Sequence, residues 1–180
     1  GFFALMVLTP SLRWLYEGID FYNALSAGLA VGIMILPIVT SLSEDAMQAV
    51  PRSLREAGYA LGGTKFYVSV KVVVPAALSG IVAAFLLAIA RAVGETMIVA
   101  LAAGALPVNI TQDGLSAVAD PTRQVQTMTG YVVQIFLGDA EANSVEYQSS
   151  YAVAGVLFLM TLAITWLGTW VTKRFREVYA

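Results

Sequence analysis

The sequence predicts an all-α integral membrane protein. Of its 180 residues, 58% are hydrophobic and only 12% are charged, which is about half the charged fraction of an ordinary soluble domain. Three stretches, 24–42, 76–106 and 151–171, are each apolar enough to cross a bilayer, which takes about 20 residues of helix. The mean hydropathy of +0.76 points the same way.

The composition also excludes several kinds of function. The chain has no cysteine and no histidine, so disulfides, thiol nucleophiles, Ser-His-Asp catalysis and most zinc sites are excluded within it. We expect no metal and no cofactor. The net charge of −2 is small, and no basic cluster with interleaved aromatic residues occurs, so we expect no nucleic-acid partner.

The first elements read as membrane helices. Residues 2–8 are typical of the end of a preceding helix, so we expect an N-terminally truncated chain that extends upstream of Gly1. The first span, 24–42, contains no charged residue. Within it, Gly28 and Gly32 form a GxxxG pair, a spacing that lets helix backbones approach closely in lipid.

Charge asymmetry predicts the orientation of the chain. The connection 43–75 and the tail after residue 171 carry most of the basic residues, namely Arg52, Arg55, Lys65, Lys71, Lys173, Arg174 and Arg176. The connection 107–150 has one basic residue, against Asp113, Asp120, Asp139, Glu141 and Glu146. Because basic loops stay in the cytoplasm, we place 43–75 and the C-terminus inside and 107–150 outside. Apolar spacing over 122–138 predicts a short helix on the outer membrane surface.

The cytoplasmic connection is patterned more strongly than a passive loop. In "PRSLREAGYALGG", Ser53 and Glu56 have the spacing of a capping box, which starts a helix, and Gly62-Gly63 is a helix stop. The sequence therefore predicts a short, self-delimited helix. The following run, 66–74, alternates like a strand, but a lone strand has no partner for its backbone groups, so we expect helix or irregular structure.

This connection resembles the EAA loop of ABC-importer permeases. The family pattern is E-A-A, three residues, G, nine residues and I-x-L-P. Here Glu56-Ala57-Gly58, Gly62 and the run 72–75, "VVVP", match its spacing throughout. The departures are Gly58 for the third-position alanine and valine for the isoleucine and leucine.

The resemblance implies a role for the short helix. In that family it is the coupling helix, which docks in a groove on a separate ATP-binding cassette ATPase subunit. Carried over, Arg55, Glu56, Ala57 and Gly62 would form or shape that contact. Glu56 has a second interpretation as the capping partner of Ser53, and the two roles are compatible.

A charged pair interrupts the second span. Arg91 lies 16 residues beyond Pro75, or about 24 Å of helix, and a central arginine costs from ~3 to more than 10 kcal/mol in lipid. Arg91 must therefore face protein or water, with Glu95 on the same helix face. The pair is either a structural ion pair or part of a substrate path. A guanidinium binds phosphate-like oxyanions bidentately, and Thr96 would add a hydroxyl donor.

The motif "RAVGETMIVALAAG", which follows the EAA loop, resembles the phosphate-specific branch of these permeases, nearer the C-type than the A-type subunit. The resemblance implies a multi-helix type I permease bundle in a bacterial inner membrane, without enzymatic activity of its own. Its partners would be the ATPase, a second permease subunit and a periplasmic or extracellular phosphate-binding protein. A sulfate or molybdate importer, an ion-coupled secondary transporter with Glu95 as proton carrier, and a non-transporting membrane scaffold stay open as alternatives.

Overall fold

The computed structural model describes residues 1–108, 114, 119–138, 141 and 144–174, with only the backbone at 174. Parts of the expected outer connection and of the tail lie outside the described residues, with Asp113, Asp139 and Arg176 among them. The described residues form helices joined by turns and short connections, with no strand among them. The prediction of an all-α chain is confirmed.

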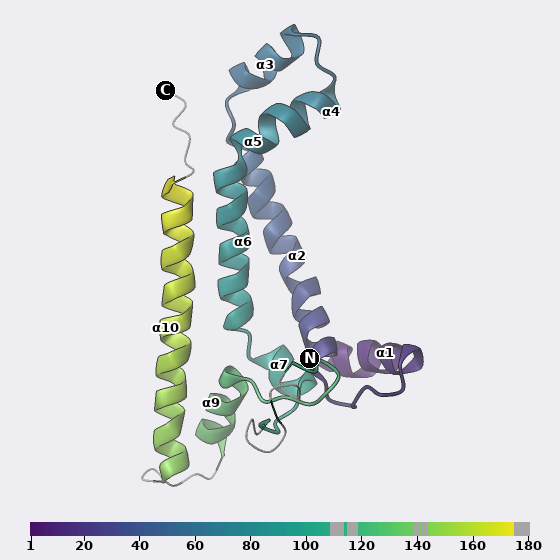
Figure 1. The fold of residues 1–180 in the computed structure, drawn as a ribbon, viewed down its shortest axis with the longest axis vertical. Coiled ribbons are helices and arrows are strands. Elements are labelled where there is room, and N and C mark those ends of the chain that lie inside the picture. The colour runs from purple at the N-terminus through teal and green to yellow at the C-terminus, as the bar shows by residue number, and fades with distance from the viewer. Residues whose placement is uncertain (109–113, 115–118, 139–140, 142–143, 175–180) are drawn as a thin grey trace. The chain divides into compact units, whose positions relative to one another are not determined.

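The helices follow one another in the order drawn in Figure 1. They are a π-helical turn (Ala4–Leu8) with α1 (Thr9–Leu15), then α2 (Ala24–Gln48), α3 (Arg52–Ala60), α4 (Lys65–Val68), a second π-helical turn (Ser69–Val73), α5 (Val74–Ala76), α6 (Leu78–Val93), α7 (Met97–Ala102), α9 (Met128–Leu137) and α10 (Val145–Arg174).

Two of the described helices, α2 and α10, are long and apolar enough to cross a membrane. A third span exists if the run 65–76 and α6 are taken together, although these are bent by 68° at their junction. The structure differs from the expected second span, 76–106, because α6 ends at Val93 and α7 begins only at Met97. Residues 66–74 are helical, which is one of the two outcomes expected for them.

The chain divides into two compact units: Gly1–Met34 with Ala92–Thr161, and Ile35–Arg91 with Leu162–Ala180. In the first unit a small core of Ala4, Ala27, Ala102 and Ala103 joins the N-terminal turn, α2 and the end of α7. Alanine side chains allow the backbones to approach closely, as is usual between membrane helices.

Polar contacts at the start of α2 also organise the first unit. Asn23 is fully buried, and its Oδ1 accepts the N–H of Ser26 at 2.7 Å, which caps α2. The first two donors of the helix are satisfied by residues 121–123: Ala24 N–H donates to the carbonyl of Arg123 and Leu25 N–H to that of Pro121. Residues 121–123 are thus anchored on a helix N-terminus whose orphan donors need partners.

The second unit has a valine-rich core around α3. Val50, Val68, Val73 and Ala77 are buried together, and half-buried apolar side chains pack around them. Close approach between helices depends on glycine in this unit. A Cβ at Gly80 would lie 2.6 Å from the Cβ of Ala46 in α2.

Candidate functional site

The expected short helix exists as α3, but its start differs from the expected one. The capping box at Ser53 and Glu56 is wrong, because α3 begins at Arg52 and Pro51 occupies the N-cap position without a side-chain hydrogen bond. The carbonyl of Pro51 accepts the N–H of Leu54 at 3.2 Å. Since a proline disfavours helix in the residue before it, Pro51 separates α3 from α2.

The end of α3 is as expected. Gly62 has a φ of +81°, a conformation that glycine adopts without strain. Its N–H donates to the carbonyl of Tyr59 at 2.9 Å, and the N–H of Gly63 donates to that of Gly58 at 3.1 Å. This pair of bonds is a Schellman motif, which satisfies the last carbonyls of the helix. Thr64 then caps α4 by accepting the N–H of Tyr67.

One face of α3 lies against the second unit's core. A Cβ at Gly58 would lie 3.0 Å from Cγ2 of Val68, whose side chain is 1% exposed. A third-position alanine of the EAA pattern would therefore press on Val68. The departure at Gly58 has this local packing as its physical reason.

Arg55 makes a contact that the sequence pattern did not indicate. Its Nη2 donates to the carbonyl of Met47 in the last turn of α2, at 2.7 Å. The same carbonyl accepts the N–H of Val50, so both of its lone pairs are used. A cation at a helix C-terminus is also favoured by the helix dipole. Arg55 thus ties α3 to the end of α2.

The other face of α3 is exposed. Glu56 and Ala57 are exposed to solvent, and the side chain of Leu61 is 90% exposed. Next to it a groove of about 540 Å³ runs between α3 and α4, with Leu61, Thr64 and Tyr67 in its lining. An exposed acidic and apolar surface on a helix is suited to contact another protein.

The structure does not bring Arg91, Glu95 and Thr96 onto one helix face. Arg91 lies in the last turn of α6 and is the last residue of the 35–91 part of the second unit, whereas Glu95 and Thr96 belong to the first unit. Arg91 is exposed, and within the described part of the chain its side chain has no hydrogen bond or ion pair. The expectation of a shared helix face is wrong because α6 ends at Val93.

Glu95 and Thr96 have local roles in the first unit. The Oε1 of Glu95 accepts the N–H of Ile98 in the first turn of α7, at 3.3 Å. Its backbone carbonyl accepts the hydroxyl of Thr129 from α9 at 3.1 Å. The hydroxyl of Thr96 donates to the carbonyl of Gly94, so its proton is already used. Gly94 thus follows the end of α6, and the Glu95 carboxylate helps to start α7.

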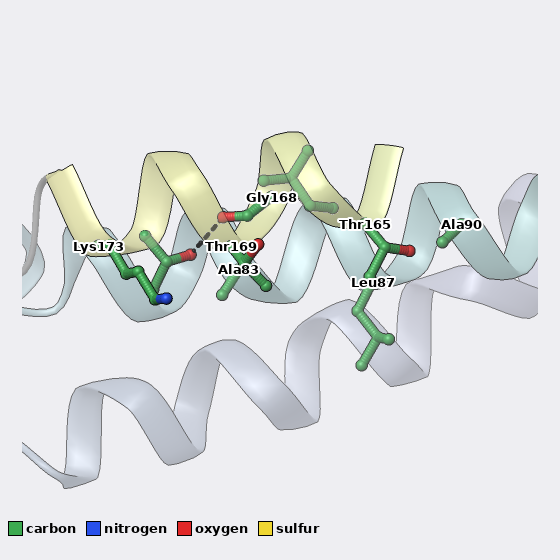
Figure 2. A pocket seen from close by; sticks show the side chains of 9 residues that line it. Ala83, Leu87, Ala90, Thr165, Gly168, Thr169 and Lys173 are labelled. Carbon is green, nitrogen blue, oxygen red and sulfur yellow. Dashed lines mark hydrogen bonds between the residues drawn. The ribbon is translucent and has the colours of Figure 1, made fainter. Parts of the chain in front are cut away.

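A second groove lies between α6 and α10 in the second unit (Figure 2). It has a volume of about 440 Å³ and is lined mainly by small and apolar side chains, with Lys173 at one end. The hydroxyls of Thr169 and Thr172 donate to carbonyls of their own helix. Among the described residues of this groove, Lys173 therefore provides the charged donor.

Asp120 shapes the segment before α9 in the first unit. Hydrogen bonds from the hydroxyl and the N–H of Thr122 hold the pKa of the Asp120 carboxyl below its usual value, and attraction to Arg123 acts in the same direction. The Arg123 Nε lies 3.3 Å from Asp120 Oδ2. Among the described residues, no group of three or more His, Cys, Asp or Glu side chains has an arrangement suited to hold a metal ion.

Comparison with known proteins identifies the chain's family. Residues 2–177 match the family described as "Binding-protein-dependent transport system inner membrane component". The chain belongs to this family. It is a membrane permease chain, and the α3 region with its EAA-like spacing is part of the match.

Relatives of this permease chain carry the names of transport permeases. It is 32% identical over 177 residues, 97% of its own length, to the "Probable ABC transporter permease protein YqgH" of Bacillus subtilis, of which it covers 53%. It is 31% identical to the "Phosphate transport system permease protein PstC" of Mesorhizobium japonicum, covering 97% of this chain and 56% of that protein. The permease chain thus spans about half the length of these relatives. No solved structure gives a significant match.

A shorter match concerns the other type of phosphate permease. The chain is 46% identical over 74 residues to the "Phosphate transport system permease protein PstA 1" of Mycobacterium tuberculosis, covering 41% of this permease chain and 24% of that protein. The matches named PstC cover more of the chain. The nearer resemblance to the C-type subunit is therefore confirmed.

Proposed function

We propose that this chain is part of a permease subunit of an ATP-driven importer of inorganic phosphate. The observation that carries the proposal is α3 itself, which is self-delimited, packed against the valine core on one face and exposed on the other. Membership of the family and the names of the PstC relatives support it. The chain hydrolyses nothing in this proposal, and a separate ATPase supplies the energy.

In the proposed mechanism the ATPase binds the exposed face of α3, with Glu56, Ala57 and Leu61 in the contact. Gly62 fixes the end of the helix and therefore the direction in which Leu61 projects. Movement of α3 then reaches α2 through Arg55 and the buried valines. The helix bundle is driven between outward-open and inward-open states as the ATPase closes and opens.

Arg91 is the proposed phosphate contact within the path. An exposed guanidinium without a partner among the described residues keeps its donors available for an oxyanion, and placing it in lipid would be costly. Glu95 and Thr96 shape the α6–α7 break beyond it, and lie near the path in this proposal. A second permease subunit completes the path, and a phosphate-binding protein delivers substrate to the acidic outer connection, which repels free phosphate.

The experiment is uptake by proteoliposomes that contain the full-length permease, its partner permease, the ATPase and the binding protein. We expect ATP-dependent uptake of radiolabelled phosphate, abolished by Arg91→Ala and only partly restored by Arg91→Lys, which keeps the charge without the planar fork. Normal uptake by an assembled Arg91→Ala complex would refute the path role. Loss of assembly in both variants would favour the scaffold alternative.

The same vesicles separate the remaining alternatives. Competition by unlabelled phosphate, but not by sulfate or molybdate, would assign the substrate within the oxyanion class. Uptake that collapses with an uncoupler but survives ATP depletion would identify an ion-coupled transporter. In that case Glu95→Gln should abolish uptake, because the carboxylate would carry the proton.

A further inference from the structure

The helical run 65–76, which follows α3, has an apolar face that nothing in the described part of the chain covers. Val68 faces the core and is buried. Phe66 and Val70 lie two residues to either side of it, about 200° around the helix, and are 78% and 42% exposed. The run therefore has two apolar faces, and α3 and the valine core occupy only one.

The bend between this run and α6 suggests what covers the second face. The two axes differ by 68°, and Figure 1 shows the run turning away from α6 where that helix begins. If α6 tilts by about 20° from the bilayer normal, as membrane helices usually do, the run lies between about 50° and 90° from that normal. Its 12 residues span only about 18 Å, too short to cross the hydrocarbon layer.

The polar residues of the run fit the membrane surface. Lys65 and Lys71 are both exposed, and "KFYVSVKVVVPA" contains no acidic residue. Lysine stems cover apolar surface while their ammonium groups reach phosphate headgroups. Tyr67, next to Phe66, is 57% exposed, and tyrosine is enriched at the level of the headgroups.

We propose that the run 65–76 lies in the cytoplasmic surface of the bilayer, with Phe66 and Val70 among the acyl chains and Lys65 and Lys71 on anionic phospholipid headgroups. The α3 helix then sits on the aqueous side of this anchor. The lipid fixes the base against which α3 is displaced. This inference depends on the cytoplasmic placement of residues 43–75 and not on the identity of the transported substrate.

A fluorophore on single cysteines tests the placement in the assembled complex with the full-length permease. The label is placed by Phe66→Cys or Val70→Cys, with Leu61→Cys on α3 as the control. The vesicles contain phosphatidylcholine and a minority of phosphatidylglycerol, and lipids brominated on the acyl chain serve as quenchers. We expect brominated lipid, but not aqueous iodide, to quench the labels at 66 and 70. Before the ATPase is added, iodide but not brominated lipid should quench the label at 61.

The alternative occupant is protein, and the same labels detect it. If the ATPase covers this face, adding it will protect positions 66 and 70 from brominated lipid as well as from iodide, and the proposal is overturned. Quenching of 66 and 70 by iodide alone also overturns it, because the face is then in water. Failure of phosphate uptake in the same vesicles would count against the proposed function but leave these quenching patterns unaffected.

The contact of Lys65 and Lys71 with anionic headgroups is tested by the lipid preference of the label at position 70. With the label at 70, quenching by brominated phosphatidylglycerol is compared with quenching by brominated phosphatidylcholine. Lys65→Gln and Lys71→Gln should each lower this preference about fivefold, as about 1 kcal/mol per basic residue near an anionic surface implies. Arg52→Gln, an exposed cation on α3, should leave it unchanged. An unchanged preference in the folded double lysine variant overturns the headgroup contact.

Discussion

Replacing Arg55 by methionine should loosen the connection between α3 and α2 without unfolding the protein. Methionine keeps the apolar stem and removes the donor that reaches the carbonyl of Met47 at 2.7 Å. A hydrogen bond from a charged donor contributes about 1.5–3 kcal/mol. Because Arg55 is only half-buried, water replaces part of that bond, and we expect a loss of about 1–2 kcal/mol.

Hydrogen exchange in the assembled complex measures this loss. A change of that size is a factor of about 5 to 30 in a local opening equilibrium, so the amides of Ala49 and Val50 at the end of α2 should exchange faster by that factor. Arg52→Met is the matched control: Arg52 is exposed on the same helix and has no hydrogen bond to another described side chain or backbone group. Equal exchange in the two variants would refute the assigned contact.

Three further substitutions probe α3 and the segment that contains Asp120. Gly58→Val should overpack the site against Val68, cost about 1–3 kcal/mol and lower the thermal unfolding midpoint of the complex. Gly62→Val should cost about 1–3 kcal/mol of backbone strain at a φ of +81° and raise the ATP hydrolysed per phosphate transported. Asp120→Asn should lower the unfolding midpoint at neutral pH, because the depressed pKa stabilises the fold above the usual value of 3.8; the difference should vanish as the pH falls through the depressed value.

Each of these predictions has an outcome that contradicts it. Gly58→Ala should lower the unfolding midpoint less than Gly58→Val. An equal midpoint in the parent and both variants would show that the approach of Gly58 to Val68 is not tight. Gly62→Asn should behave nearly like the parent, since asparagine tolerates positive φ. If Asn and Val at position 62 have the same effect on coupling, backbone strain is not the cause. A pH-independent difference at Asp120 would exclude its charge as the origin.

Local signals explain which parts of the fold the sequence predicts well. The end of α3 was predictable because Gly62-Gly63 encodes a positive φ and a Schellman motif within a few residues. Its start was not, because Ser53 and Glu56 have the right spacing for a capping box while the preceding Pro51 already sets the boundary. The break at 94–96 was missed for a related reason. The summed hydropathy of 76–106 predicts one continuous span. In the structure the Glu95 carboxylate instead accepts a hydrogen bond from the first turn of α7.

Contacts between segments far apart in the chain have no such local signal in the sequence. The donors of Ala24 and Leu25 are satisfied by carbonyls about 100 residues away, and backbone carbonyls look alike in every sequence. An Asn at position 23, just before a long apolar run, was the available signal for the cap of α2. The contact of Arg55 with Met47 was also hidden, since family resemblance directs attention to the docking surface and not to the inner face.

The two faces of α3 allow docking and transmission to be separated. Glu56 and Leu61 are exposed, so in the proposed mechanism their replacement should change the affinity of the ATPase for the permease while α3 and α4 keep their structure. Arg55 and Gly58 face the protein, so their replacement should leave that affinity nearly intact and lower the transport obtained per ATP. In the proposed mechanism α3 therefore has two measurable quantities on opposite sides, the binding of the ATPase and the transmission of its movement to the bundle. If variants on both faces changed only the affinity, α3 would be a docking site and movement would reach the bundle by another route.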